Sequence, residues 1–343
     1  MGQATGLSFE RSGDALGDVQ DEVVASTPPE DDPMILVFDT SHAAGTAIDL
    51  SGHLAGSNLE IDWGDGTVNS STAHDWGTDG TYTVRISGDL TGYGSTDLSG
   101  VEDEMLVAVT GFAEVLTSLE NGFFGAARNI TMPAILPAGV TTLESAFYAA
   151  ASFNQDISSW SVSAVTSMRN MFRDADAFNQ DLNAWAPAQL VDARAMFSGA
   201  DAFDGPIDQW TMSNLTLANE MFSDATSFDQ PLDSWGGDLG GLSQASDMFA
   251  GATAFNQTLD SWVMTSVTDA DGMFDGASAF NGEVGSWIFP SATAMDRIFR
   301  NAVSFDRDLS GWCVPNIPVQ PGDFDTGAAS WGSARPGWGT ACP

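Results

Sequence analysis

The fold is decided by Phe147-Tyr-Ala-Ala-Ala-Ser-Phe-Asn-Gln-Asp-Ile-Ser-Ser-Trp160, a pattern that returns seven times along the chain. Each unit reads Phe-x-x-Ala-x-x-Phe-Asx, followed by Ile, Leu or Val and, three residues later, by Trp. The period is 25 residues, with one step of 27 whose two extra residues we place between Gly236 and Gly241. The tryptophans keep the same period, at Trp160, Trp185, Trp210, Trp235, Trp262, Trp287 and Trp312.

A period this regular is typical of repeat proteins, in which each unit buries its apolar edge only against its neighbours. The apolar residue three positions before each Trp predicts a short parallel strand. The i, i+3 spacing of Met-Phe-x-x-Ala-x-x-Phe predicts one or two helical turns. We therefore expect a repeat solenoid of short parallel strands and short helical turns. Its Phe and Trp columns should form the core, the alternative being a platform on which sugars stack.

One polar position of the repeat is always Asn or Asp. A side-chain oxygen stacked at this turn can accept backbone N–H groups that the turn would otherwise leave open. We expect this structural ladder rather than its alternative, a row of ligand-binding groups. The ladder comprises Asn154, Asn179, Asp204, Asp229, Asn256, Asn281 and Asp306.

A degenerate unit precedes the regular ones, with Phe124, Ala127 and Ile130 in the Phe-x-x-Ala-x-x-Phe positions. The runs 129–133 and 140–143 have a leucine-rich-repeat cadence. Here the chain resembles the BspA-type leucine-rich-repeat surface proteins, in the branch whose 25-residue repeats read Phe-Asn-Gln-Asp-Ile-Ser-x-Trp. The resemblance covers roughly residues 35 to 343, and it implies a leucine-rich-repeat fold and a role in surface adhesion or recognition.

Two segments before the repeats resemble another family. Ile61-Asp-Trp-Gly-Asp-Gly-Thr67 and Gly80-Thr-Tyr-Thr-Val-Arg-Ile-Ser-Gly88 are similar to the hairpin and the Tyr-Thr-Val strand of PKD-like β-sandwich domains. The Gly-Asp-Gly triplet also reads as a tight turn, and residues 81–86 alternate like a half-buried strand. We expect a small antiparallel β-sandwich-like domain that caps the first coil.

The domain limits follow from these patterns. Residues 1–33 form an acidic, polar arm, 34–90 the small PKD-like β domain, and 91–145 the degenerate first leucine-rich-repeat-like coils. Residues 146–312 hold the seven repeats, and 313–343 a C-terminal cap. The arm has no basic n-region and no apolar h-region, unlike a signal peptide. We expect it to anchor the molecule to other virion or surface proteins.

The charge balance excludes several kinds of partner. The chain has 47 acidic residues against 10 arginines, with no lysine, for a formal charge of −37. Such a field repels phosphate backbones and anionic lipid surfaces, so we expect no nucleic-acid binding. No apolar run approaches the roughly 18 residues of a membrane span, so we expect no membrane insertion.

The two cysteines bracket the terminal segment, at Cys313 and Cys342. A disulfide between them would hold the tail over the last coil and add about 3 kcal/mol in the chain-entropy model. It would also indicate an oxidising environment. The alternative is two free thiols.

Catalytic motifs are scarce in the sequence. Its three histidines, His42, His53 and His74, lie outside the repeats and lack metal-ligand spacing. We therefore predict no catalytic residues, no metal ligands and no cofactor. Calcium at acidic clusters such as Asp269, Asp271 and Asp275 is the alternative to diffuse cation screening. Aromatic residues off the period are the better candidates for exposed contacts, namely Tyr93, Tyr148, Trp331 and Trp338.

These observations predict a non-enzymatic structural or adhesion protein of an extracellular surface. The absence of a leader favours a phage virion component, such as a fibre, a receptor-binding protein or a capsid decoration protein. The expected partner is a host-surface protein or glycan, with self-association into a homo-oligomer left open. A bacterial cell-surface adhesin is the alternative, and a secreted carbohydrate-active enzyme is a remote one that rests on the many carboxylates.

Overall fold

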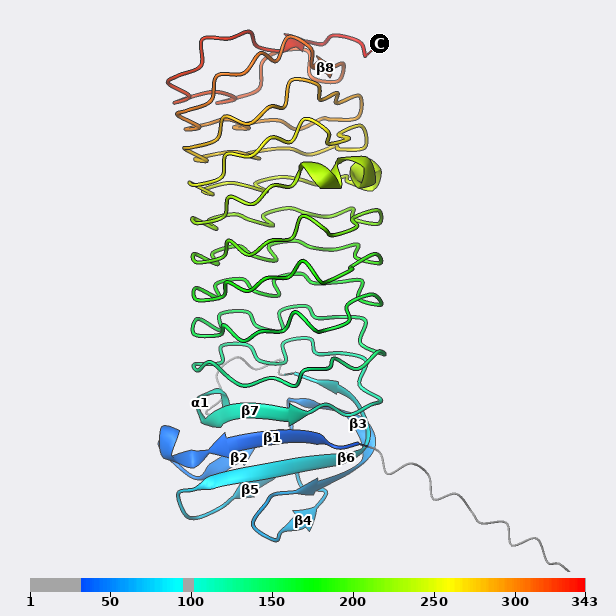
Figure 1. Cartoon of the computed structure of the whole chain (residues 1–343), viewed down its shortest axis with the longest axis vertical. Coiled ribbons are helices and arrows are strands. Elements are labelled where there is room, and N and C mark those ends of the chain that lie inside the picture. Colours follow the sequence, from blue (N-terminus) through cyan, green and yellow to red (C-terminus); the bar gives the residue numbers. More distant parts are fainter. Residues whose placement is uncertain (1–31, 95–101, 343) are drawn as a thin grey trace, which may run out of the picture. The chain divides into compact units, whose positions relative to one another are not determined.

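The computed structural model describes residues 32–94 and 102–342, and it is shown in Figure 1. The predicted anchoring arm, residues 1–33, thus falls almost wholly outside the described residues. From Asp31 onward the chain forms one compact unit. This unit begins with an antiparallel sheet and continues as stacked coils of nearly equal length (Figure 1).

The sheet has five strands in the order β4-β3-β6-β1-β7, and every pairing in it is antiparallel. The long central strand β6 (Thr81–Tyr93) pairs with β1 (Met34–Asp39) on one side and β3 (Leu54–Asp62) on the other. β4 (Val68–Asn69) and β7 (Leu106–Gly111) form the two edges. The buried residues of β1 alternate along the strand, as expected for a sheet with one covered face.

Shorter elements surround this sheet. β2 (Ala47–Asp49) and β5 (Ala73–Asp75) make a separate antiparallel pair. The 3-10 helix η1 (Thr40–His42) follows β1, and its N-terminus is capped by the Asp39 carboxylate. The single α-helix of the described residues, α1 (Glu102–Met105), leads directly into β7.

The coils that follow are joined by backbone hydrogen bonds from each layer to the next. The N–H groups of Ser145, Phe147 and Ala149 donate to the carbonyls of Arg169, Met171 and Arg173, at 2.7, 2.9 and 2.7 Å. The intervening N–H groups close turns within the coil, as when Tyr148 donates to the carbonyl of Ser145. Alternate peptide groups therefore point along the stack, and the others lie within a layer.

Left-handed residues make this alternation geometrically feasible. Each coil carries a residue of positive φ two positions before its leading Phe and another two positions after it, as at Asn170 and Asp174 around Phe172. Only some of these residues are glycine, although L-residues pay about 1–2 kcal/mol in this region. The interlayer hydrogen bonds must offset that strain in every coil.

The aromatic residues stack into continuous columns within the core. The leading phenylalanines Phe172 and Phe197 lie 5.5 Å apart between ring centroids, and Phe172 also stacks on Phe178 at 3.9 Å. The tryptophans stack likewise, as for Trp185 and Trp210 at 6.0 Å. All seven predicted tryptophans are buried, and each indole N–H donates to a backbone carbonyl of the preceding layer.

The long repeat contains the 3-10 helix η2 (Asp233–Gly241), visible as the one coiled ribbon among the layers in Figure 1. Trp235 keeps the regular step from Trp210, whereas the buried Leu242 is displaced by two residues relative to Leu215. The two extra residues therefore fall between Trp235 and Leu242, and η2 absorbs them without displacing the core columns.

The C-terminal segment covers the last layer. β8 (Cys313–Val314) pairs with β9 (Gly337–Trp338) in parallel, and Cys313 and Cys342 form the predicted disulfide. Trp331 packs edge-on against Phe299 and Phe305, the last rings of their columns. The cap thus removes the final aromatic layer from water.

The predicted leucine-rich-repeat-like solenoid of short parallel strands and helical turns is wrong. The five-stranded sheet is antiparallel, and between Gly111 and Cys313 the structure has no strand and only η2 as a helix. Residues 157–160, expected to be a strand, close a turn in which the Trp160 N–H donates to the Ile157 carbonyl. Left-handed residues interrupt the expected helical turns, and between Gly111 and Cys313 parallel pairing is limited to one-residue bridges such as that between Thr142 and Ser167. The β-sandwich-like domain is likewise a five-stranded sheet with one separate two-stranded pair.

The register proposed for the first degenerate unit is also off by one residue. Phe123, not Phe124, stacks under Phe147 at 5.4 Å, and Ala126 is buried in the place expected for Ala127. Phe124 instead lies outside the core, where its ring contacts that of Tyr148 at 4.7 Å. Two adjacent phenylalanines made both registers compatible with the sequence.

The indole hydrogen bonds should contribute measurably to stability. Replacing Trp235 by Phe removes the 3.1 Å bond to the Ile207 carbonyl as well as part of the ring, for a loss of about 1–3 kcal/mol. Trp331→Phe is the matched control, because its buried indole N–H has no acceptor among the described residues. Chemical denaturation should show the larger loss for Trp235→Phe; equal losses would contradict the role given to the indole bond.

A second pair of variants tests the packing between layers. Gly251 and Gly276 occupy the same left-handed position in successive coils, with φ of +69° and +73°. A Cβ at Gly251 would overlap Asp224 Oδ1, whereas at Gly276 the nearest atom is 3.7 Å away. Both alanine variants should lose about 1–2 kcal/mol from backbone strain, and Gly251→Ala should lose more.

The excess loss at Gly251 should vanish in an Asp224→Gly background, which removes the overlapping carboxylate and retains the left-handed backbone. A double-mutant cycle from denaturation curves measures this coupling. Additive effects of the two substitutions would show that the carboxylate does not limit the approach of the layers.

Candidate functional site

The seven Asx residues form the ladder expected for a structural role. The backbone N–H of Asn179 donates to Oδ1 of Asn154, that of Asp204 to Asn179, and so on along the column at 2.8–3.0 Å. Asn129 continues the ladder before Asn154, and the N–H groups of Gly332 and Ser333 end it on Asp306. One side-chain oxygen at each position is therefore committed to the backbone of the next coil.

The side chains of the tryptophan and phenylalanine columns also have a structural role, since they are buried in the core and pack against each other. A sugar could not stack on them without opening the core. The columns that reach solvent are those beside the buried ones. They include the position after the leading Phe, which is Ser198 in the one coil where it is buried and is partly exposed as Phe124, Tyr148, Arg173, Ser223, Ala250, Asp275 and Arg300.

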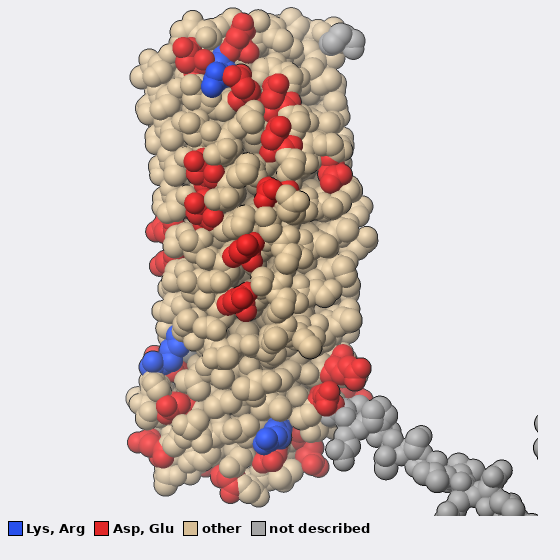
Figure 2. All heavy atoms as spheres, viewed as in Figure 1, with Lys and Arg blue, Asp and Glu red and all other residues tan. Residues whose placement is uncertain are grey.

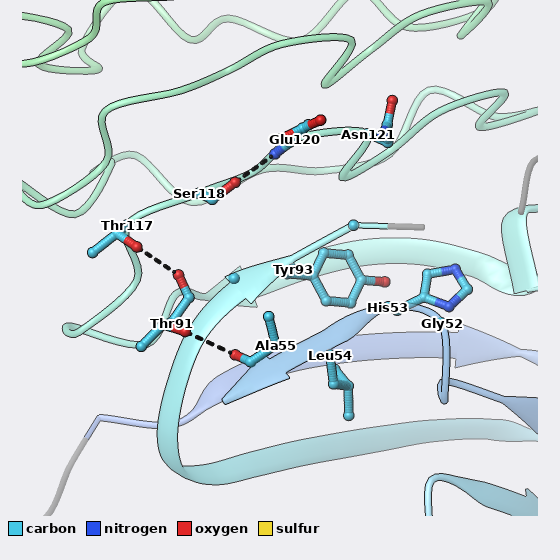
Figure 3. A pocket seen from close by; sticks show the side chains of 12 residues that line it. Gly52, His53, Leu54, Ala55, Thr91, Tyr93, Thr117, Ser118, Glu120 and Asn121 are labelled. Carbon is cyan, nitrogen blue, oxygen red and sulfur yellow. Dashed lines mark hydrogen bonds between the residues drawn. The ribbon is translucent and has the colours of Figure 1, made fainter. Parts of the chain in front are cut away.

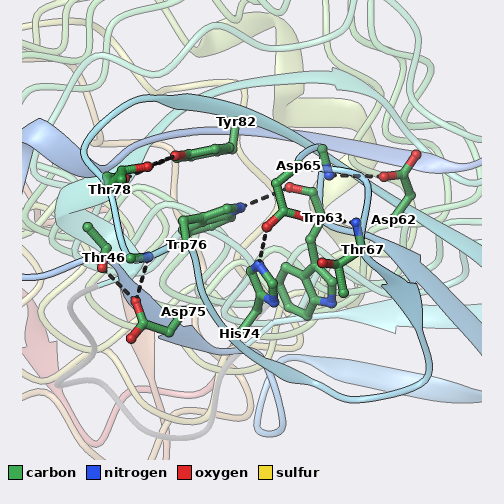
Figure 4. A network of polar contacts seen from close by, with 12 residues as sticks. Thr46, Asp62, Trp63, Asp65, Thr67, His74, Asp75, Trp76, Thr78 and Tyr82 are labelled. Atoms are coloured by element: carbon green, nitrogen blue, oxygen red, sulfur yellow. Dashed lines mark hydrogen bonds and ion pairs between the residues drawn. The ribbon is translucent and has the colours of Figure 1, made fainter.

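The sheet domain contains an aromatic and polar network, shown in Figure 4. The His74 ring stacks on Trp63 at 4.9 Å, and its Nε2 lies 2.8 Å from Asp65 Oδ2. Trp76 stacks on Tyr82 at 4.6 Å and donates its indole N–H to the Trp63 carbonyl. The backbone N–H of Thr67 and then the His74 contact lower the pKa of Asp65. This network joins the β3–β4 turn to β5, and we interpret its role as structural.

The three histidines do not come together in one site. His42 lies 3.1 Å from Asp39 at the end of β1, and His53 packs against Tyr93 beside the first coil. Among the described residues no group of three or more His, Cys, Asp or Glu side chains is placed to hold a metal ion. Within the same ranges no helix is long and apolar enough to cross a bilayer.

A hollow of about 370 Å³ lies between the sheet and the first coil (Figure 3). His53 and Leu54 border it from the start of β3, Tyr93 from the end of β6, and Ser118 and Glu120 from the coil. At its rim the Thr117 hydroxyl of the coil donates to the Thr91 carbonyl of β6, and the Thr91 hydroxyl donates within the sheet to the Ala55 carbonyl of β3. The hollow thus occupies the junction at which sheet pairing gives way to stacked coils.

Among the charged side chains on the outer surface of the coils, carboxylates far outnumber arginines, as Figure 2 shows for one face. The acidic cluster considered for calcium is engaged within the protein. Asp275 pairs with Arg300 and Arg297, Asp271 accepts the Asp296 N–H, and Asp269 accepts the Asp271 N–H. The sequence analysis missed these ion pairs, although Asp275 and Arg300 occupy the same column one repeat apart.

Burial acts on several of these carboxyl groups. Loss of hydration raises the pKa of Asp247 and of Asp271, and the nearby Arg297 only partly opposes the shift. Burial likewise raises the pKa of Asp174. In contrast, backbone N–H groups of Ser333 and Gly332 lower the pKa of Asp306. The acidic exterior therefore contains both destabilising and stabilising charges.

The sequence pattern of the DUF285 family, described as Mycoplasma proteins of unknown function, matches residues 117–235 and 238–329. The match covers more than half of the chain. The chain belongs to the DUF285 family. The gap in the match, residues 236–237, falls within η2, where the structure accommodates the two extra residues. No curated protein and no solved structure matches the chain.

The opposite pKa shifts of Asp247 and Asp306 predict opposite effects of charge removal. Asp247 has a folded-state pKa above its ordinary value of 3.8, so its favourable contribution is present below that value and is lost as pH rises through the folded pKa. Asp306 has a lowered pKa, so its contribution is present above 3.8 and is lost as pH falls.

As pH rises from 3 to 7, the free energy of unfolding of Asp247→Asn should therefore increase relative to that of the unmodified chain. That of Asp306→Asn should decrease relative to the unmodified chain over the same range. Both substitutions remove one negative charge and leave a side-chain oxygen that can accept a hydrogen bond. Each variant is therefore the control for the change in net charge in the other. Thermal denaturation across this pH range measures both, and a common sign would refute the assignment.

Proposed function

We propose that this protein is a non-enzymatic surface protein whose stacked coils display a recognition surface. The observation that carries the proposal is the contrast between columns. The Phe, Trp and Asx positions that repeat from coil to coil are buried or bonded to the neighbouring layer, whereas the position after the leading Phe varies along the stack, from Tyr148 and Arg173 to Asp275. A constant interior with a variable exterior is how repeat proteins present an extended binding surface.

The rigidity of the coils supports the same function. Side chains at the outer positions are attached to a backbone that hydrogen-bonds to the neighbouring layers, as at Arg173 and Ala149. Such residues are held in place before a partner arrives, which reduces the entropy lost on binding. The partner proposed is a host-surface protein or glycan.

The resemblance to BspA-type surface proteins and to PKD-like domains supports a location outside the cytoplasm. The disulfide between Cys313 and Cys342 supports it too, because such bonds persist in oxidising surroundings. We retain a phage particle as the proposed carrier, with a bacterial cell envelope as the alternative. Either carrier exposes the acidic coils to an aqueous exterior.

Quantitative mass spectrometry of density-purified extracellular particles and of envelope fractions from one culture tests this proposal. Enrichment at stoichiometric levels in particles is the expected result, and enrichment in the envelope would establish the alternative carrier. Recovery of the chain only among soluble cytoplasmic proteins would refute a surface role. A cytoplasmic marker protein measured in the same fractions serves as the control for lysis.

A further inference from the structure

A second hollow, on the outer side of the coils, gathers three of the arginines of this acidic chain. It measures about 380 Å³, within the roughly 300–1,000 Å³ of small-ligand sites. Arg169, Arg173 and Arg194 line it, together with the amides of Asn170, Asn219 and Gln244 and one carboxylate, that of Glu220. Four successive coils contribute to this lining, so the hollow exists only because the repeats stack.

Two of the three arginines keep hydrogen-bonding capacity. Arg194 is held by Asp192 through both Nε and Nη2. The Arg169 guanidinium has one ion pair within the described part of the chain, to Glu144 at 3.5 Å. Arg173 donates from Nη1 to Glu220 at 3.3 Å, and its buried Nε finds no hydrogen-bond acceptor among the described residues, with Asp174 at 3.9 Å. A buried N–H without an acceptor is costly to the protein. Because this Nε is enclosed, a ligand oxygen would bind the outer N–H groups of Arg169 and Arg173 instead.

The surroundings favour a sugar as the bearer of that oxygen. Carboxamide groups offer donors and acceptors together, which suits a ligand with many hydroxyl groups. In the outer column that contains Arg173, the two preceding positions are Tyr148 and Phe124, whose rings contact each other at 4.7 Å and are only partly buried. Aromatic rings beside planar polar groups provide an apolar face for a sugar ring and partners for its hydroxyls.

A peptide ligand fits the same surface less well. Peptides often bind by adding a strand to an open sheet edge. Here the outward-facing backbone has few groups to offer, because the N–H of Ala149 is bonded to Arg173, that of Asn170 to Arg194 and that of Ala195 to Asn219. Recognition must therefore come from side chains, and the guanidinium groups select for carboxylate because they can bind it through two N–H groups at once.

We propose that the hollow lined by Arg169, Arg173 and Arg194 binds a carboxylate-bearing saccharide through its guanidinium and carboxamide groups. This inference rests on the proposed function, for which it names the site and the class of ligand. The acidic remainder of the described surface would repel such saccharides, which favours binding at the arginines of this hollow.

An array of immobilised oligosaccharides, in which uronic-acid-containing and sialylated members are paired with neutral ones, tests the proposal with the full chain. The intact protein should bind carboxylated members in preference to their neutral counterparts at 150 mM salt. Arg173→Ala should weaken this binding by about tenfold or more, as expected when a charge-assisted hydrogen bond is lost.

Arg307→Ala is the matched control, since Arg307 pairs with Glu283 at 2.6 Å, is similarly exposed and does not line the hollow. Its binding should equal that of the unmodified chain. Arg169→Glu provides a second test, because Arg169 has the weakest structural contacts of the three and its reversal should abolish binding without unfolding the coils. Circular dichroism verifies the fold of each variant.

Binding of neutral sugars alone, binding unchanged by both arginine variants, or no binding to any carboxylated member would each overturn the proposal. These outcomes are independent of where the protein is found. A surface location without carboxylate-dependent binding would refute the sugar site only, and carboxylate-dependent binding by a cytoplasmic protein would refute the proposed function only.

Discussion

The interlayer hydrogen bond is the constraint on which the structure depends. In each coil the peptide groups before residues such as Ser145, Phe147 and Ala149 present their N–H toward the next layer and their C=O toward the previous one. A parallel strand achieves such pairing with extended backbone. Here the chain alternates left- and right-handed residues instead, so the same interlayer bonding is obtained from a backbone made of consecutive turns. The aromatic columns, the Asx ladder and the indole bonds all follow from this spacing of the layers.

Aligned peptide groups also give each row of interlayer bonds a polarity, which is reversed in the row where the Thr166 N–H donates back to the Thr141 carbonyl. Peptide dipoles that point the same way add, and their N–H end attracts negative charge. In the row that contains Ser145, Phe147 and Ala149 this end faces the C-terminal cap. The last coil of that row carries Asp323 and Asp325 on either side of Phe324, and both carboxylates are further held by Thr326, Gln320 and Arg335. Acidic residues at this end are thus compatible with the backbone, whereas an extended run of arginines there would not be.

The buried columns could be predicted from the sequence, whereas the backbone conformation of the coils could not. Period and residue type were sufficient to place Trp160 and its six counterparts in the core, and to assign Asn154 and its counterparts to a ladder. They were insufficient to tell turns from strands and helices, because the same i, i+3 spacing arises from successive turns. The left-handed positions hold glycine in some coils but Ala149, Glu220 or Arg297 in others, and these residues do not normally favour positive φ. Arg169 and Arg173 lie in one coil and Arg194 lies one repeat later, and only alignment of the outer columns of successive repeats brings Arg194 beside the other two.

The same construction explains how one chain can be acidic almost everywhere and still hold an arginine-lined hollow. Each outer position is decoupled from the core, since the inward residues of its coil already satisfy the packing and the backbone bonds. A substitution at the position of Arg173 therefore alters local chemistry with little effect on the layer beneath, as the range from Tyr148 through Arg173 to Asp275 in one column illustrates. Charge excess keeps anionic ligands away from most of this surface, and a local group of arginines, although each is paired with a carboxylate, then gains specificity without an enclosed pocket. Variation by column, on a backbone fixed by interlayer hydrogen bonds, is the physical basis on which such a surface can acquire a new partner.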